Sequence, residues 1–126
     1  MERQGSKRAA TLWVRTPTAR YPVWVASGLL RRCGRRLREL RPGARRVFVV
    51  SSPRVWALWG SELAHSLRAA RLQTETVLFT DAEENKRTRT VEKLAEQLLA
   101  RGADRNAVLL ALGGSVVGDV TGFLAA

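Results

Sequence analysis

The sequence predicts an α/β fold with a Rossmann-like, mainly parallel sheet and helices on both faces. Three observations indicate this class. Short apolar runs alternate along the chain with longer segments whose apolar residues recur at helical spacing. Proline or glycine marks most of the junctions between them. The last apolar run, residues 107–112, ends at Gly113 and Gly114, as a buried strand does when it turns into a helix.

Composition limits the kind of protein. Hydrophobic residues make up 45% of the 126 residues, which suits one α/β domain over residues 11–126 after a disordered basic tail at 1–10. No apolar run approaches the roughly 20 residues of a membrane helix, and the first residues lack the apolar stretch of a secretory signal. Cys33 is the only cysteine, which fits a reducing compartment. We predict a cytoplasmic protein without a membrane contact.

The formal net charge of +11 is concentrated in residues 1–54, which hold 14 basic residues against two acidic ones. Such a basic half can bind nucleic acid. No zinc-finger spacing or aromatic RNA-binding motif accompanies it, so a solvated arginine-rich surface is the stronger interpretation. A third reading is that the positive field attracts phosphorylated small molecules.

The first elements are two strands and a helix. Residues 12–15 and 21–26 predict strands joined by a turn at 16–18, because β-branched and aromatic side chains dominate both runs. A helix is predicted over 29–40, where proline and glycine follow. Its buried stripe should consist of Leu30, Cys33, Leu37 and Leu40.

A second strand-and-helix unit follows. A strand is predicted at 47–50, and the Ser51-Ser52-Pro53 sequence can cap a helix over 54–70. Gly60 argues against an unbroken helix there. The inward face should consist of Val55, Leu58, Trp59, Leu63 and Leu67.

The third unit has a strand at 74–79, a polar loop at 80–86 and a helix over 88–100 that ends near Gly102. Repeated units of this kind build a parallel sheet. The buried side of the helix should consist of Val91, Leu94, Ala95, Leu98 and Leu99.

The glycine-rich turn after residue 112 is the strongest candidate site. Apolar residues after Gly118 predict a helix that is still under way at Ala126, which suggests a truncated chain. A strand, a glycine turn and a helix N-terminus together bind phosphate or pyrophosphate through free N–H groups. The polar loop at 81–86 should end at the same sheet edge, where its carboxylates and Lys86 can contact a ligand. From its residues alone, a solvated loop is favoured there.

The sequence Gly113 to Asp119, followed by Thr121 to Ala126, resembles the glycine signature of 3-dehydroquinate synthase, with Ser115 in place of the usual third glycine. Glu83 and Lys86 match a glutamate and a lysine that bind NAD in that family. Ser52 stands where relatives often have an Asp or Asn that helps to hold the adenosine. The resemblance implies NAD as cofactor, bound by Ser52, Asp81, Glu83, Lys86, Gly113, Gly114, Ser115, Val116, Val117, Gly118 and Asp119.

The resemblance also implies a reaction. The family converts 3-deoxy-arabino-heptulosonate 7-phosphate to 3-dehydroquinate and phosphate in the shikimate pathway, usually as a homodimer. Its zinc ligands, a Glu and two His, lie in a second, helical domain that we expect to be absent here. His65 is the only histidine, and we predict a surface or packing role for it. This chain alone should therefore be inactive.

Two other classes stay open at this stage. A related sugar-phosphate cyclase or metal-dependent polyol dehydrogenase shares the predicted domain, and a basic nucleic-acid-binding module would share only its charge.

Overall fold

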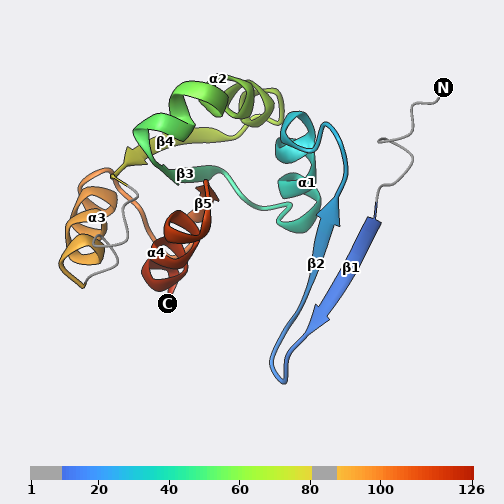
Figure 1. The fold of residues 1–126 in the computed structure, drawn as a ribbon, viewed down its shortest axis with the longest axis horizontal. Helices are drawn as coiled ribbons and strands as arrows, with labels where there is room; N and C mark the ends of the chain where they lie inside the picture. The colour runs from blue at the N-terminus through green and yellow to red at the C-terminus, as the bar shows by residue number, and fades with distance from the viewer. Residues whose placement is uncertain (1–9, 81–87) are drawn as a thin grey trace.

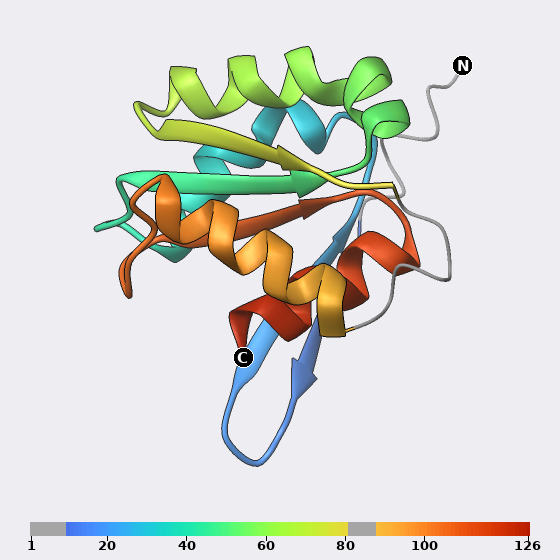
Figure 2. The same ribbon diagram turned by 90° about the vertical axis from the view of Figure 1, so that its left-hand side faces the viewer.

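A computed structural model describes residues 10–80 and 88–126 (Figures 1 and 2). The first nine residues of the predicted tail and the loop at 81–87 lie outside the described residues. The strands are β1 (Ala10–Arg15), β2 (Arg20–Val25), β3 (Arg46–Ser51), β4 (Gln73–Leu78) and β5 (Val108–Leu112). The helices are the short 3-10 helix η2 (Leu30–Arg32), α1 (Cys33–Leu40), α2 (Pro53–Ala69), α3 (Thr88–Ala100) and α4 (Ser115–Ala125).

The predicted parallel sheet is confirmed. Its strands run in the order β4-β3-β5, and both pairings are parallel. β3 lies in the centre, and its residues from Val47 to Ser51 are all buried. This burial is expected of a strand that is covered on both faces. Helices α1 and α2 cover one face of this sheet, and α3 and α4 cover the other (Figure 2).

Alternating residues of β3 supply the two hydrophobic cores. Val47 and Val49 pack with Leu63 and Leu67 of α2 on one face. Phe48 points to the other face, where it packs with helices α3 and α4. This alternation follows from the two-residue period of a strand.

The first two strands form a separate antiparallel sheet. β1 and β2 pair along their full length, and the turn between them is closed by a hydrogen bond from the Thr16 N–H to the Ala19 carbonyl oxygen at 2.8 Å. The hairpin projects beyond the three-stranded sheet in both views (Figures 1 and 2). The predicted strands and turn are therefore confirmed, although they lie outside the parallel sheet.

The predicted inward face of α2 was partly wrong. Leu58 is 66% exposed and Trp59 is 51% exposed, whereas Gly60 and Ser66 are buried. Ser66 faces inward where α1 approaches α2 closely: a Cβ at Gly34 would lie 2.2 Å from the Ser66 carbonyl oxygen. Gly60 leaves room for the ring of Trp56 in its own helix. Despite Gly60, α2 is unbroken.

Two other predicted core residues are also exposed. Leu40 ends α1 at the surface, and Leu99 of α3 is 70% exposed. Each lies at the edge of its apolar stripe, so a small rotation of the helix turns it to solvent. Cys33 is half-buried as part of the first core, and this burial raises the pKa of its thiol.

Candidate functional site

The carboxyl ends of the three parallel strands meet at one edge of the sheet. Ser51, the last residue of β3, pairs with Leu78 of β4 and Leu112 of β5, which are the last residues of their strands. The Ser51 hydroxyl donates a hydrogen bond to the Leu112 carbonyl oxygen at 2.6 Å. The Phe79 N–H donates to the Ser51 carbonyl oxygen at 3.0 Å. In an open α/β sheet this edge is where ligands bind.

The turn after β5 leads directly into α4. Gly114 is the N-cap residue, and no side chain caps the helix there. The Gly118 N–H donates to the Gly114 carbonyl oxygen at 3.0 Å, so the helix begins at Ser115 and not after Gly118 as predicted. The N–H groups of the first helical turn have no acceptor within the helix. Together with the helix dipole, they form a suitable environment for an anionic group.

The glycines of this turn have two different roles. A Cβ at Gly113 would lie 2.8 Å from Cγ2 of Val117, so this glycine lets the turn pack against its own helix. A Cβ at Gly114 or Gly118 would meet no atom within 4 Å. These two positions face open space, which lets a ligand approach the main chain.

The other predicted residues of the turn divide between core and surface. Val117 is fully buried, whereas Val116 is half-buried and packs against the second core. Ser115 and Asp119 are exposed on α4, and Asp119 has an interaction partner. A ligand at this turn would therefore meet the main chain and the Ser115 side chain first.

Ser52 has a structural role at the start of α2. It is 1% exposed, and its hydroxyl accepts a hydrogen bond from the Val55 N–H at 3.3 Å. That bond is an N-cap, as the serine-proline sequence predicts. A contact between Ser52 and adenosine remains a prediction.

From the sequence, the neighbouring Ser51 was considered only as part of the capping sequence before α2. This buried side chain ties the end of β3 to the end of β5. The signal available in the sequence was a hydroxyl residue ending an otherwise apolar strand, because a buried hydroxyl needs a hydrogen-bond partner.

The predicted residues Asp81, Glu83 and Lys86 lie outside the described residues. Thr80 precedes them at the end of the β4 segment and has an interaction partner. Phe79 is bonded to the end of β3, so the chain leaves the sheet at the same edge as the glycine turn.

Over residues 10–80 and 88–126, no group of three or more His, Cys, Asp and Glu side chains lies close enough to hold a metal ion. His65 is exposed on α2, which agrees with the first of its two predicted roles, surface or packing. Within the same ranges, no helix is long and apolar enough to cross a membrane.

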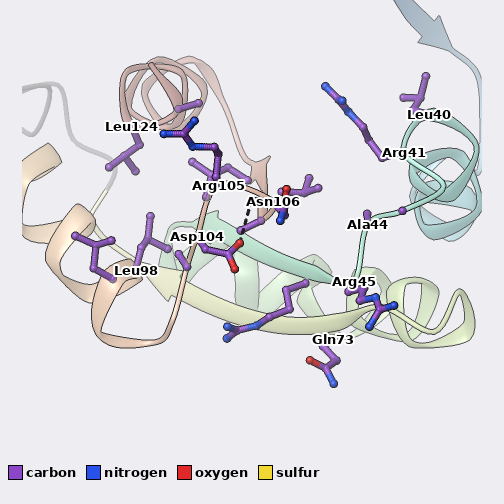
Figure 3. A pocket seen from close by; sticks show the side chains of 18 of the residues that line it. Leu40, Arg41, Ala44, Arg45, Gln73, Leu98, Asp104, Arg105, Asn106 and Leu124 are labelled. Carbon is purple, nitrogen blue, oxygen red and sulfur yellow. Dashed lines mark hydrogen bonds between the residues drawn. The ribbon is translucent and has the colours of Figure 1, made fainter.

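A basic hollow lies at the opposite, amino end of the sheet. Its volume is about 1560 Å³, and Arg41, Arg45 and Arg105 are among the residues that line it (Figure 3). Asp104 lies there too, but its carboxylate accepts a hydrogen bond from the Asn106 N–H at 2.9 Å. The hollow is therefore separate from the turn that the sequence predicts as the site.

Comparison with known proteins identifies the relatives of this chain. Residues 76–126, which include the glycine turn, match the family model described as 3-dehydroquinate synthase N-terminal. This chain is related to the 3-dehydroquinate synthases. It is 38% identical over 112 residues to the 3-dehydroquinate synthase of Koribacter versatilis, covering 89% of this chain and 31% of the relative. It is 40% identical over 106 residues to that of Nitrobacter winogradskyi, covering 84% of this chain and 27% of the relative.

The relatives are much longer than the region that they share with this chain. The 126-residue chain spans roughly a third of their length. A solved structure of 2-deoxy-scyllo-inosose synthase superposes with a TM-score of 0.79 and 21% identity, covering 92% of this chain and 32% of that one. A second structure of that enzyme, with the same TM-score of 0.79, contains carbaglucose-6-phosphate, NAD+ and Co2+. These likenesses show that the chain has the predicted dehydroquinate synthase-like fold.

Proposed function

We propose that this chain is the NAD-binding portion of a 3-dehydroquinate synthase. The observation that carries the proposal is the uncapped N-terminus of α4, which follows two glycines at the carboxyl edge of a parallel sheet. The identity of 34–40% to 3-dehydroquinate synthases supports it. So does the NAD+ found in a related cyclase of the same fold.

In this proposal the main chain of the glycine turn holds the NAD pyrophosphate. The N–H groups of Ser115 and Val116 donate to the phosphate oxygens, because they have no acceptor within the helix. Gly114 and Gly118 let the cofactor approach closely, since no atom lies where their side chains would be. Asp81, Glu83 and Lys86 contact the rest of the cofactor from the β4 side. When bound, NAD supplies reversible hydride transfer to and from a substrate hydroxyl carbon.

The proposed reaction of the whole protein converts 3-deoxy-arabino-heptulosonate 7-phosphate to 3-dehydroquinate and phosphate in the shikimate pathway. This is a phosphorus–oxygen lyase reaction of a cytoplasmic homodimer. The family's zinc does not fit the described residues, which offer no group of three metal-ligating side chains. We therefore assign no step of the chemistry to a metal bound by this chain. A related sugar-phosphate cyclase that takes another phosphorylated sugar is the second candidate, because such an enzyme shares the fold.

Replacing Gly114 with valine tests the cofactor site. At Gly114 φ is −87°, and an added Cβ meets no protein atom within 4 Å, so we expect Gly114→Val to fold and to obstruct the ligand. We expect NAD affinity, measured by isothermal titration calorimetry, to fall at least about tenfold. Gly43→Val is the matched control, since Gly43 also faces open space but lies at the amino end of the sheet. Equal NAD affinities for the two variants would contradict the proposed site.

The 126-residue chain alone should not turn over the heptulosonate phosphate. Elimination and ring closure need groups that move protons over the substrate, and the described residues place no histidine or acidic cluster at the glycine turn. Phosphate release in the presence of NAD and zinc is the assay, with a full-length 3-dehydroquinate synthase as positive control. Turnover by the chain alone would show that its catalytic groups have been missed.

A further inference from the structure

Arginines from three loops line the basic hollow at the amino end of the sheet. Arg41 and Arg45 belong to the loop between α1 and β3. Arg71 follows α2, and Arg105 precedes β5. We call these four residues the hollow arginines, and Figure 3 shows Arg41, Arg45 and Arg105 around the hollow. Asp104 is the one acidic residue among the described residues that line the hollow, so its lining carries a net positive charge.

The helix ends at this edge of the sheet do not account for the hollow arginines. α1, α2 and α3 end here, and the carbonyl groups at a helix C-terminus attract cations. Other arginines already bond to these carbonyl groups, since Arg38 donates to the Ala70 oxygen at 2.8 Å. Arg46, which also lines the hollow, donates to the Arg101 oxygen at 2.6 Å. In the part of the chain that the structure describes, the side chains of the hollow arginines have no ion pair or hydrogen bond, so their guanidinium groups are available to a ligand.

Arg71 has a strained backbone. Its φ is 63°, and among the described residues no other non-glycine residue has a positive φ. It occupies the C-terminal turn of α2, where the Leu72 N–H donates to the Leu67 carbonyl oxygen at 3.0 Å. Gly102 holds the same position after α3, with a φ of 86°. Because glycine adopts this conformation without strain, the arginine indicates a use for its side chain at the hollow.

The lining also indicates the class of ligand. None of the described lining residues is aromatic, so the hollow has no platform on which a nucleobase could stack. A guanidinium group pairs with phosphate through two parallel N–H donors. One phosphate group has too few oxygens to pair with all the hollow arginines in this way, whereas a linear triphosphate has enough. We propose that the hollow binds a compact polyphosphate, an anion with at least three linked phosphate groups.

The polyphosphate site is separate from the proposed NAD site. The hollow arginines lie at the amino edge of the sheet, and the glycine turn lies at its carboxyl edge. The two sites share no residue, so a polyphosphate and NAD can bind the chain at the same time. The polyphosphate site therefore goes beyond the proposed function and does not depend on it.

Isothermal titration calorimetry with inorganic tripolyphosphate tests the site, using the 126-residue chain in about 50 mM salt. We expect a dissociation constant of about 10 µM or below. Arg105→Gln should raise it at least about fivefold, because one guanidinium group is lost. Arg35→Gln is the matched control, since it removes the same charge from an exposed position on α1 that does not line the hollow. Equal affinities of the two variants for tripolyphosphate would overturn the proposal.

Arg71→Gly separates a binding role from a structural one. Because glycine relieves the strain at a φ of 63°, this variant should unfold at a higher midpoint temperature than the wild-type chain when no ligand is present. It should also bind tripolyphosphate at least about fivefold more weakly, since a guanidinium group is lost. An Arg71→Gly variant that binds tripolyphosphate as tightly as the wild-type chain would contradict the proposed site.

Other ligands identify the occupant of the hollow. ATP carries the same triphosphate chain, so an affinity equal to that of tripolyphosphate supports a site for the chain in either molecule. Weaker binding of ATP supports a site for inorganic polyphosphate alone. Orthophosphate that binds as tightly as tripolyphosphate would overturn the proposal, as would displacement of tripolyphosphate by about 10 µM of a short DNA duplex. Saturating NAD should leave the affinity for tripolyphosphate unchanged, and competition between the two would instead indicate binding at the glycine turn and overturn the proposal.

Discussion

Gly60 is a residue whose missing side chain determines local packing. It lies in the interior of α2, where alanine would normally favour the helix by about 1 kcal/mol. An added Cβ would lie 2.3 Å from a ring carbon of Trp56, whose indole packs against the first core. The absence of a side chain at Gly60 leaves room for this ring. For the stability of the chain, that packing effect is larger than the difference in helix propensity.

Gly60→Ala should destabilise the chain by about 1–3 kcal/mol, because the Trp56 ring has to leave its position. Gly122→Ala is the matched control in α4, where the added Cβ meets no atom within 4 Å. That variant should gain up to about 1 kcal/mol. Urea unfolding measures both changes, and a Gly60→Ala variant as stable as Gly122→Ala would contradict this account.

Helices α1 and α2 are joined by one buried hydroxyl. Ser66 accepts a hydrogen bond from the Gly34 N–H and donates one to the Arg31 carbonyl oxygen, each at 2.9 Å. These bonds satisfy two main-chain groups at the place where the helices come closest. The packing of α1 on α2 thus depends on a polar contact inside an apolar interface.

Ser66→Ala should cost about 2 kcal/mol, since it leaves the buried Gly34 N–H without a partner. Ser61→Ala, on the exposed side of the same helix, should change stability by less than about 0.5 kcal/mol. Thermal unfolding of the two variants gives the comparison. If the two variants unfold at the same midpoint temperature, a water molecule has replaced the lost Ser66 hydroxyl.

The sequence could predict where the elements are but not always which side of a helix is buried. In α2 apolar residues surround the helix, so spacing alone could not choose between Leu58 and Trp56. The buried side was determined by Gly34 and Ser66, where the two helices touch, and by Gly60, which leaves room for the Trp56 ring of its own helix. Close approach between two elements is a tertiary property, and a single-sequence pattern does not contain it.

The glycine turn was predicted more accurately than its helix. Glycines and a preceding apolar run indicated the turn, and the structure has it at the carboxyl edge of the sheet. The start of α4 at Ser115 was missed, because glycine and β-branched valine are both poor helix formers. Here the helix is stabilised by burial of Val117 and Val120 in the cores.

At the scale of the whole molecule, part of the positive charge is structural. Arg38 donates hydrogen bonds to the Ala44 and Ala70 carbonyl oxygens, at 2.6 Å and 2.8 Å. Arg46 donates to the carbonyl oxygens of Arg101 and Gly102, beyond the end of α3. These guanidinium groups hold loops in place, so they are less available to a nucleic acid than the net charge suggests.

Binding to duplex DNA should therefore be weak and non-specific. At physiological salt we expect a dissociation constant above about 10 µM for a short duplex, with the steep salt dependence of phosphate contacts alone. Fluorescence anisotropy over a salt series measures this, and two unrelated duplex sequences serve as controls for each other. Submicromolar affinity for one sequence would favour a nucleic-acid-binding function over the proposed enzyme.

The hydrogen bond from Ser51 to Leu112 has a consequence for the energetics of any ligand at this edge. It fixes the end of β5 against the central strand directly before the chain turns into α4. The main-chain donors of the turn are thus held in place before a ligand arrives. Preorganisation of this kind lowers the entropic cost of association, because little of the protein has to be ordered on binding. The remaining entropic cost of association comes from fixing the rotatable bonds of the ligand itself.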